Sequence, residues 1–471
     1  MSIVHRESQS RRPVVCVQGL GFVGTAMAIA TAAARDAQGS PCYEVIGVDL
    51  PTPSGSARVA AINAGELGLN STDPDLQRYL GVCREQGNLS AATDENVYAR
   101  ADVVLVDVHL DVESAAGEQP HVDFTGFKAA IATLGRHLQP GALVIVETTV
   151  PPGTCEHVVI PTLAAELRRR GLPEDALLVA HSYERVMPGR DYLKSITNFW
   201  RVYSGATPAA AEACERFLSR VINIAEYPLT RLPTMAASET AKILENSYRA
   251  TNIAFIHEWG RFAERAGVDL FAVLDAIRMR PTHNNIRQPG FGVGGYCLTK
   301  DPAFVMVSSA QLLGFKDLDF PFCRLAMRTN AEMPLHSLER LRGAFGGNLS
   351  GRRILVLGVS YRQDVGDTRY SPTEVFVRAA EQDGATVVAH DPLVSSWPEL
   401  NREVASQLPD PKPFDAVVLA VPHREYAELD MAAWLAGSNA IMLDTNHVLS
   451  SAQIAKLNDS GRRPQFIGRG S

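Results

Sequence analysis

The chain has 471 residues, 46% of them hydrophobic and 21% charged, with a formal net charge of −7. This length predicts a multidomain globular protein, and the acidic balance argues against a nucleic-acid partner. The seven cysteines are scattered without a CxxC pair, which argues against a zinc site or disulfide framework. No apolar run approaches the roughly 18 residues needed to cross a bilayer. We therefore expect a soluble cytoplasmic protein with no metal site and no membrane partner.

The first part of the chain alternates strand and helix patterns. A short apolar strand is expected at 13–20, an Ala-rich helix at 24–34, and a second strand at 43–50. Further β-branched runs lie at 101–110, 141–150 and 175–184. This alternation favours a parallel sheet covered by helices.

A glycine-rich turn follows the first strand and opens the first helix. Its sequence is GxGxxG, formed by Gly19, Leu20, Gly21, Phe22, Val23 and Gly24. The first glycine permits the turn, the second lets a pyrophosphate approach the backbone, and the third lets helix and strand pack closely. Asp49 ends the second strand, where a carboxylate would bind both ribose hydroxyls and repel a 2′-phosphate. The turn therefore predicts an NAD site, and the alternative is a tight turn without a ligand.

A second polar turn follows the strand at 141–150. Thr148 and Thr149 precede the Pro151-Pro152-Gly153 turn. Ligands of α/β sheets bind at the carboxyl ends of strands, so these hydroxyls are candidate ligand contacts. The alternative is ordinary turn chemistry.

The middle of the chain, from about 233 to 343, loses the strand pattern. Residues 238–267 predict one long helix, capped at Ser238 or an adjacent residue and ended by Gly267. A further helix is expected at 268–280.

Polar residues share one face of the long predicted helix. Lys242, Asn246 and Arg249 are spaced i, i+4 and i+7. An ammonium and a carboxamide aligned in this way could stabilise a developing oxyanion. The alternative is a solvated helix face on which Glu239 pairs with Lys242.

Cys297 follows a glycine-rich stretch, 289–296, that is unsuited to the interior of a helix or strand. Glycines at this place would allow a bulky ligand to approach the backbone. Lys300 could favour the thiolate, and Asp301 could accept a proton. The alternative is a small buried thiol.

The last part of the chain restarts the strand–helix alternation. A strand is expected to end at Gly358, and 373–392 predicts a helix, a turn and a strand. Further strands are expected at 413–423 and 439–446. The predicted fold class is α/β, with two Rossmann-like domains joined by a long central helix and a small all-α domain.

These motifs together resemble a known family. The glycine turn with Asp49, "TTVPPG", "SYERVMPG", Lys242-x-x-x-Asn246, "GGYCLTKD" and "GVSYRQDVGDTRYSP" occur in this order. Over about residues 13–450 the chain resembles the UDP-glucose/GDP-mannose dehydrogenase family of nucleotide-sugar 6-dehydrogenases. The resemblance implies a flexible N-terminus (1–12), an NAD domain (13–230), a helical dimerisation domain (231–343) and a UDP-sugar domain (344–471). It also implies a homodimer or higher homo-oligomer.

The resemblance implies oxidation of a sugar C6 alcohol to a carboxylate, with two NAD⁺ as hydride acceptors. Cys297 would trap the aldehyde as a thiohemiacetal and then carry a thioester that water hydrolyses. Lys242 and Asn246 match residues that stabilise oxyanions, and Asp301 matches the residue that assists water and proton transfers. Glu184 and Thr149 match residues that place water and substrate.

The resemblance also extends to the two binding sites. The cofactor would be contacted by the glycine turn, Asp49, Thr149 and Lys300. The nucleotide sugar would be contacted by Glu184, Arg185, Arg249, Gly294, Tyr296, Arg362 and Arg369.

The departures from the family pattern bear on the sugar. The UDP-glucose branch usually has a second glutamate where this chain has Pro188, and "ERVMPG" is similar to the branch acting on UDP-N-acetylhexosamines. "CLTKD" is more similar to the UDP-glucose branch. Arg362 replaces a common lysine, and Asn446 and His447 stand where UDP-glucose enzymes tend to have arginines.

We therefore expect oxidation of a UDP-N-acetylhexosamine, either GlcNAc or ManNAc, with UDP-glucose as the alternative substrate. A β-hydroxyacid dehydrogenase, which oxidises once and without a cysteine, is a further alternative. A non-catalytic sensor that keeps the fold is the alternative from another class.

Overall fold

The computed structural model describes residues 11–69, 71–113, 119–187, 189–315 and 317–470. The chain forms two compact units: unit 1 contains Met1–Ile243 and Phe304–Leu318, and unit 2 contains Leu244–Ala303 and Asp319–Ser471. Of the expected flexible N-terminus, only Arg11 and Arg12 lie within the described residues. Within the described ranges, no helix has the length and apolar character needed to span a membrane.

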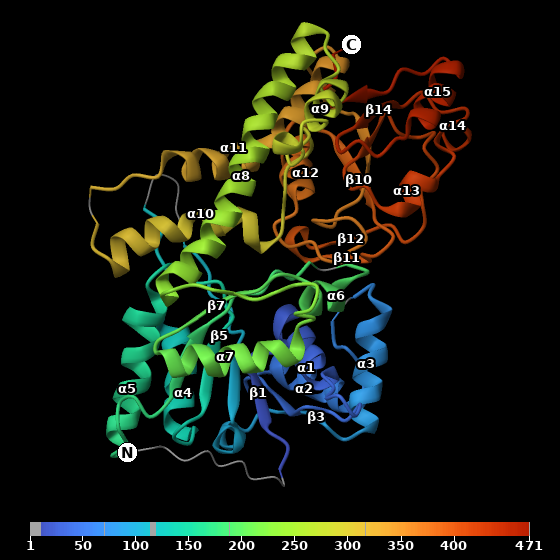
Figure 1. Ribbon diagram of the computed structural model, residues 1–471. Helices are drawn as coiled ribbons and strands as arrows, with labels where there is room; N and C mark the ends of the chain where they lie inside the picture. Colours follow the sequence, from blue (N-terminus) through green and yellow to red (C-terminus); the bar gives the residue numbers. More distant parts are fainter. Residues whose placement is uncertain (1–10, 70, 114–118, 188, 316, 471) are drawn as a thin grey trace. The chain divides into compact units, whose positions relative to one another are not determined.

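Unit 1 is built on an eight-stranded sheet with the order β3-β2-β1-β4-β5-β6-β7-β8 (Figure 1). Its neighbouring strands are parallel except for the antiparallel pair β6–β7. The strands are β1 Val14–Gln18, β2 Glu44–Val48, β3 Leu89–Ala92, β4 Val103–Val106, β5 Leu143–Val146, β6 Leu178–His181, β7 Val202–Gly205 and β8 Thr230–Arg231.

Helices cover both faces of this sheet. They are α1 Phe22–Ala33, α2 Pro53–Ala64, α3 Pro74–Glu85, η1 Glu95–Arg100, α4 Thr125–His137, η2 Cys155–Val159, α5 Ile160–Arg169, α6 Tyr192–Thr197 and α7 Pro208–Val221. Alternate residues of β1 enter different cores: Val15 and Val17 pack with α1 and α7, whereas Val14 and Cys16 pack with α4 and α5. This two-sided burial explains why the parallel strands are continuously apolar in sequence.

Unit 2 contains a smaller parallel sheet with the order β10-β9-β13-β14-β15. Its strands are β9 Arg353–Leu357, β10 Thr386–His390, β13 Ala416–Leu419, β14 Ile441–Asp444 and β15 Gln465–Phe466. A separate antiparallel ribbon pairs β11 Ser396–Trp397 with β12 Arg402–Glu403. Strand β9 repeats the alternation of β1, since Ile354 and Val356 pack in one core and Leu355 and Leu357 in another.

The remaining helices complete the fold. They are α8 Met235–Ala266, α9 Leu270–Arg278, η3 Pro281–His283, α10 Tyr296–Val307, η4 Ser308–Leu312, α11 Pro321–Ala344, α12 Pro372–Gln382, η5 Pro398–Leu400, α13 Arg424–Glu428, α14 Met431–Trp434 and α15 Ser451–Asp459. Residues of α8 and α10 belong to both units. The predicted fold class is confirmed: the chain is α/β, with two Rossmann-like parallel sheets and a long central helix.

The long helix α8 starts earlier than predicted. The Ala237 amide donates to Thr234 Oγ1 at 3.1 Å, so Thr234 acts as the cap, and Ser238 lies inside the helix. Met235 is 3% exposed and packs in the core of unit 1, which accounts for the extra turn. The end is as predicted, because Gly267 follows α8 with a φ of +71°.

Candidate active site

The glycine turn of unit 1 has the backbone that its sequence predicts. Gly19 has a φ of +96°, and a Cβ there would lie 2.7 Å from the Asp107 carbonyl oxygen. A Cβ on Gly24 would lie 1.8 Å from the Gly19 oxygen. Both glycines are therefore required by packing.

The start of α1 fits a phosphate. Gly21 is the N-cap, no side chain caps the helix, and a Cβ at Gly21 would meet nothing within 4 Å. A helix N-terminus without a side-chain cap attracts an anion such as a phosphate. Phe22 and Val23 open α1 and are half-buried.

Asp49 follows β2 and binds the glycine turn. Its Oδ2 accepts from the Leu20 amide at 3.2 Å, and its Oδ1 accepts from the Leu50 amide at 2.7 Å. Arg58 of α2 donates through Nε to Oδ2 at 2.8 Å. Sequence reasoning missed Arg58, because no fixed spacing links a residue inside the next helix to the carboxylate. The aspartate stands where a ribose carboxylate is expected.

Two predicted residues of unit 1 meet at the end of β6. Lys242 Nζ donates to the Glu184 carbonyl oxygen at 2.8 Å and lies 3.7 Å from Glu184 Oε1. Lys242 is 7% and Glu184 8% exposed, so the solvated-face alternative for this part of the helix is wrong. Arg185 donates to the Trp200 carbonyl oxygen at 2.8 Å and to the Tyr183 hydroxyl at 3.1 Å, and Lys242 lies over the same Tyr183 ring. Thr149 is half-buried after β5.

Glu239 has a different role from the surface pairing with Lys242. Its two carboxylate oxygens accept from the amides of Gly153 and Cys155, at 2.6 and 2.8 Å. It therefore fastens the Pro-Pro-Gly turn to α8. Burial raises the pKa of Glu239 to about 7, although the two amide hydrogen bonds favour the carboxylate.

A buried charged cluster lies at the carboxyl ends of β4 and β5. Glu147 Oε1 and Arg201 Nη2 are 2.9 Å apart with almost no exposed side chain. Burial, opposed by Arg201, raises the pKa of Glu147 to about 7. Burial and the neighbouring carboxylates of Glu147 and Glu184 raise the pKa of Asp107. Sequence reasoning missed this cluster, although both acids end adjacent apolar strands.

Unit 2 brings the other predicted catalytic residues together. Asn246 Nδ2 donates to Asp301 Oδ2 at 2.7 Å, and Lys300 Nζ lies 3.2 Å from Asp301 Oδ1. Asn246 is 2% and Asp301 1% exposed. Cys297 is exposed and lies one turn before Asp301 on α10. The alternative of a buried thiol is wrong.

The glycines before Cys297 are explained in part by packing. A Cβ on Gly294 would lie 2.3 Å from the Tyr370 carbonyl oxygen, and one on Gly295 would lie 2.8 Å from the Tyr361 ring. The Gly295 amide donates to the Arg369 carbonyl oxygen at 3.2 Å. The loop after β9 thus packs against the glycine stretch, and helix α10 begins directly afterwards. Tyr296 and Cys297 are the first two residues of α10, so the stretch unsuited to a helix interior ends at Gly295.

The predicted substrate residues of unit 2 are gathered in part. The Arg369 guanidinium lies 4.6 Å over the Tyr296 ring and pairs with Asp367 Oδ2 at 2.5 Å. Arg362 is exposed on the same loop, and Arg249 is half-buried on α8. Pro188, used to separate the sugar branches, lies outside the described residues. In the described ranges, no group of three or more His, Cys, Asp or Glu residues could hold a metal.

The fold and the glycine turn define a dinucleotide-binding protein with a second Rossmann-like unit. Three family models match: the NAD binding, central and UDP binding domains of the UDP-glucose/GDP-mannose dehydrogenase family, at residues 14–221, 236–332 and 355–451. The chain belongs to this family and is an NAD-dependent nucleotide-sugar dehydrogenase, an oxidoreductase acting on CH–OH groups.

Individual relatives agree over nearly the whole chain. UDP-N-acetyl-D-mannosamine dehydrogenase of Pyrococcus horikoshii is 30% identical, covering 88% of this chain and 91% of that protein. The enzyme of the same name from Methanocaldococcus jannaschii is 29% identical, covering 93% and 92%. The crystal structure of NDP-N-acetyl-D-galactosaminuronic acid dehydrogenase from Methanosarcina mazei Go1 is 26% identical, with a TM-score of 0.79, covering 98% and 96%.

Proposed function

We propose that this dehydrogenase oxidises the C6 alcohol of a UDP-N-acetylhexosamine, GlcNAc or ManNAc, to the uronic acid. The relatives from Pyrococcus, Methanocaldococcus and Methanosarcina are named for N-acetylated sugars, and the "ERVMPG" sequence is similar to that branch. The overall reaction consumes the alcohol, one water and two NAD⁺, and it yields the carboxylic acid, two NADH and two protons.

Cys297 carries the chemistry of the second oxidation. Its sulfur attacks the C6 aldehyde to form a thiohemiacetal, whose oxidation leaves a thioester, and water then releases the acid and restores the thiol. Bound NAD⁺ supplies the acceptor for the hydride lost from C6 in each oxidation. The covalent bond keeps the aldehyde from leaving between the two oxidations.

Other side chains support these steps by donating hydrogen bonds and moving protons. Lys242 and Asn246 donate to the oxyanions that develop at C6. Asp301 accepts a proton from the attacking thiol or water. Glu184 and Thr149 orient the water and the sugar. Lys300, beside Asp301, contacts the cofactor.

The contact between Asn246 and Asp301 carries the proposal. Burying a carboxylate costs free energy that packing alone would not require. Asp301 is nevertheless buried, accepts from the Asn246 amide and lies one helical turn from the exposed Cys297. This arrangement is well suited to holding a proton acceptor near a nucleophile. The supporting substrate contacts are Arg185, Arg249, Gly294, Tyr296, Arg362 and Arg369.

The domain boundaries and assembly are part of the same proposal. We assign NAD binding to 13–230, dimerisation to 231–343 and UDP-sugar binding to 344–471. The active form is a homodimer or higher homo-oligomer in the cytoplasm.

A substrate panel tests the proposal. Purified enzyme is incubated with NAD⁺ and UDP-GlcNAc, UDP-ManNAc, UDP-GalNAc, UDP-glucose or GDP-mannose, and NADH and acid are quantified. We expect two NADH for each acid formed, with the highest kcat/KM for UDP-GlcNAc or UDP-ManNAc. Preference for UDP-glucose would overturn the substrate assignment, and one NADH per product would overturn the cysteine mechanism.

A further inference from the structure

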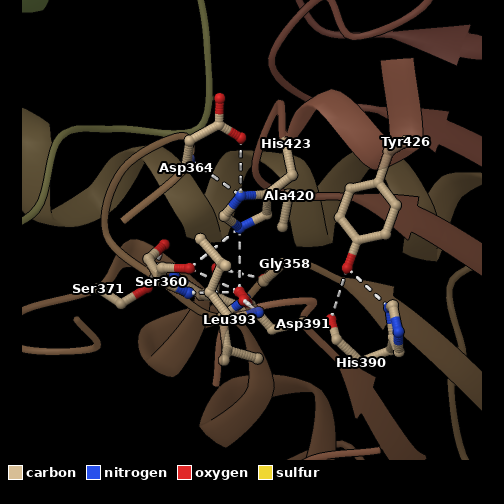
Figure 2. A network of polar contacts seen from close by, with 12 residues as sticks. Gly358, Ser360, Asp364, Ser371, His390, Asp391, Leu393, Ala420, His423 and Tyr426 are labelled. Carbon is tan, nitrogen blue, oxygen red and sulfur yellow. Dashed lines mark hydrogen bonds and ion pairs between the residues drawn. The ribbon is translucent and has the colours of Figure 1, made fainter. Parts of the chain in front are cut away.

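A buried polar network lies at the carboxyl ends of β9, β10 and β13 in unit 2 (Figure 2). Asp391 follows β10, and His423 follows β13. Their side chains are 0% and 1% exposed, and His423 Nε2 lies 3.1 Å from Asp391 Oδ2. The proposed chemistry uses neither residue.

Asp391 binds the start of the loop that follows β9. Its Oδ2 accepts from the amides of Val359 and Ser360, at 2.8 and 3.0 Å, and from Ser360 Oγ at 2.6 Å. Its Oδ1 accepts from the Leu393 amide at 2.9 Å. Burial opposes ionisation, but hydrogen bonds from His423 and Ser360 lower the pKa of Asp391 to about 2. The carboxylate is therefore a charged anchor for the loop.

His423 binds the same loop four residues further on. Its Nδ1 lies 3.0 Å from the Asp364 amide, which can only donate, so Nδ1 is the acceptor and the ring proton is on Nε2. Nε2 then donates to Asp391 or to Ser360 Oγ, which is 3.0 Å away. Asp364 has a φ of +55°, a strained backbone for a residue other than glycine. The histidine thus holds a conformation that the loop would not favour alone.

The arrangement differs from a hydrolytic triad. Asp391 and Ser360 both contact Nε2, whereas a triad places the serine and the carboxylate on opposite ring nitrogens. Ser360 is also fully buried, so no substrate reaches its hydroxyl. The network has a positioning role.

The two anchors lie on either side of Arg362, which is expected to contact the nucleotide sugar. Ser360 and Asp364 are held, and Tyr361 and Arg362 lie between them. We propose that Asp391 and His423 are positioning residues that fix the loop so that Arg362 faces the UDP moiety. This inference rests on the proposed function.

Replacements of His423 separate positioning from general stability. His423→Leu keeps most of the volume against the Tyr426 ring, 5.7 Å away, and removes both nitrogens. Because the Asp364 amide then loses a buried acceptor, we expect the Kd for UDP to rise about tenfold or more. The Kd for NAD⁺ and kcat at saturating sugar should stay within about twofold of wild type.

Two comparison variants sharpen the test. His423→Asn keeps an acceptor close to the position of Nδ1 and should restore most of the UDP affinity. His390→Leu is the matched control: His390 is also buried, and its Nδ1 hydrogen-bonds the Tyr426 hydroxyl at 2.8 Å on another segment, α13, instead of the loop. We expect it to lower the Tm without changing the UDP affinity.

Calorimetric titration with UDP decides between the outcomes. Wild-type UDP affinity in folded His423→Leu overturns this inference alone, and so does an equal loss in His390→Leu. Wild-type protein that fails to bind UDP overturns the proposed function as well. If His423→Leu does not fold, Ser360→Ala replaces it, since this variant removes only one hydroxyl from the network. It should still raise the Kd for UDP about threefold. An unchanged Kd for this variant would overturn the inference.

Discussion

The two units use one turn for two purposes. Gly19 and Gly358 follow the first strand of their sheets with φ of +96° and +101°. Their amides donate to the last residue of the neighbouring strand, Val48 or His390, each at 2.8 Å. An aspartate comes after that strand in both units and accepts from the amide after the glycine, Asp49 at 3.2 Å and Asp391 at 2.8 Å.

The units differ in the segment that comes after the turn. In unit 1, helix α1 begins at once, and its N-terminus has no side-chain cap. In unit 2, residues 359–371 intervene, and Ser371 caps α12 through the Thr373 amide. An uncapped helix N-terminus of this kind attracts a pyrophosphate. In unit 2 the amides that follow the turn donate to Asp391 within the protein, and the loop presents side chains instead. An aspartate after the second strand therefore indicates a ribose-binding site only where a helix begins directly after the glycine turn.

The largest expected effect separates the proposed role of Cys297, a residue of unit 2, from NAD binding by unit 1. Cys297→Ala should lower acid formation by at least about 10³-fold, because no covalent intermediate can form. NAD⁺ affinity should not change. Chromatography of the acid and a fluorescence titration with NAD⁺ measure both.

Cys323→Ala is the matched control, since Cys323 is a half-buried cysteine of the same unit. It should retain wild-type activity. Uronate formation at the wild-type rate by Cys297→Ala would exclude the covalent mechanism.

The next effect tests which glycines of unit 1 serve packing and which serve the ligand. Gly24→Ala should destabilise unit 1 by about 3 kcal/mol or more, because the new methyl overlaps a backbone oxygen. Gly21→Ala should keep the wild-type Tm, since its methyl meets no protein atom, yet weaken NAD⁺ binding about tenfold. Thermal melts and NAD⁺ titrations of both variants check this. Equal losses of Tm would show that both glycines are structural.

The carboxylates that hold loops in the two units, Glu239 and Asp391, have pKa values shifted in opposite directions. The pKa of Glu239 is raised to about 7 by burial, whereas that of Asp391 is lowered to about 2. With a folded pKa above its unfolded value, Glu239 stabilises most at low pH, and this contribution is lost as pH rises through about 7. Asp391 contributes fully above about pH 4.

Glu239→Gln should therefore gain stability relative to wild type between pH 5 and pH 8, by about 2 kcal/mol. Urea unfolding at both pH values measures the gain. Glu212→Gln, at an exposed position of α7 in the same unit, is the control and should show no such gain. A pH-independent difference would show that Glu239 is ionised throughout this range.

The smallest expected effect concerns cofactor choice. Asp49→Ala should weaken NAD⁺ binding about tenfold, because the ribose hydroxyls lose their acceptor. It should also improve NADP⁺ binding, because Arg58, now 2.8 Å from the carboxylate, would be left to meet a 2′-phosphate. Titrations with both cofactors test this, and unchanged affinity for both would remove the ribose assignment.

Much of the fold was predictable from local patterns. The apolar runs of β1, β2, β4, β5 and β9 identified these strands because strands buried on both faces are continuously apolar. Helix α10 was missed because glycines precede it and Pro302 lies inside it, so its local sequence favours a loop. Helix α8 was predicted three residues short at its start because Thr234 and Ser238 are equally plausible caps.

The site was harder to predict from the sequence where the tertiary fold, and not local spacing, determines which residue a side chain contacts. Glu239 has the helical spacing for a surface pair with Lys242, but the fold brings the Pro-Pro-Gly turn to it instead. Arg58 and His423 carry no spacing that connects them with Asp49 and Asp391. Only the sheet order, which places β2 beside β1 and both β10 and β13 beside β9, makes these pairs possible.

The exposure of Cys297 makes the enzyme suitable for chemical footprinting. All seven cysteines fall within the described residues, and the others are buried or half-buried. Burial raises the pKa of Cys16 to about 12 and also raises those of Cys155 and Cys214, which suppresses their reactive thiolates. A limiting amount of an alkylating reagent should therefore mark Cys297 first. The rate of labelling would then report site occupancy without any turnover.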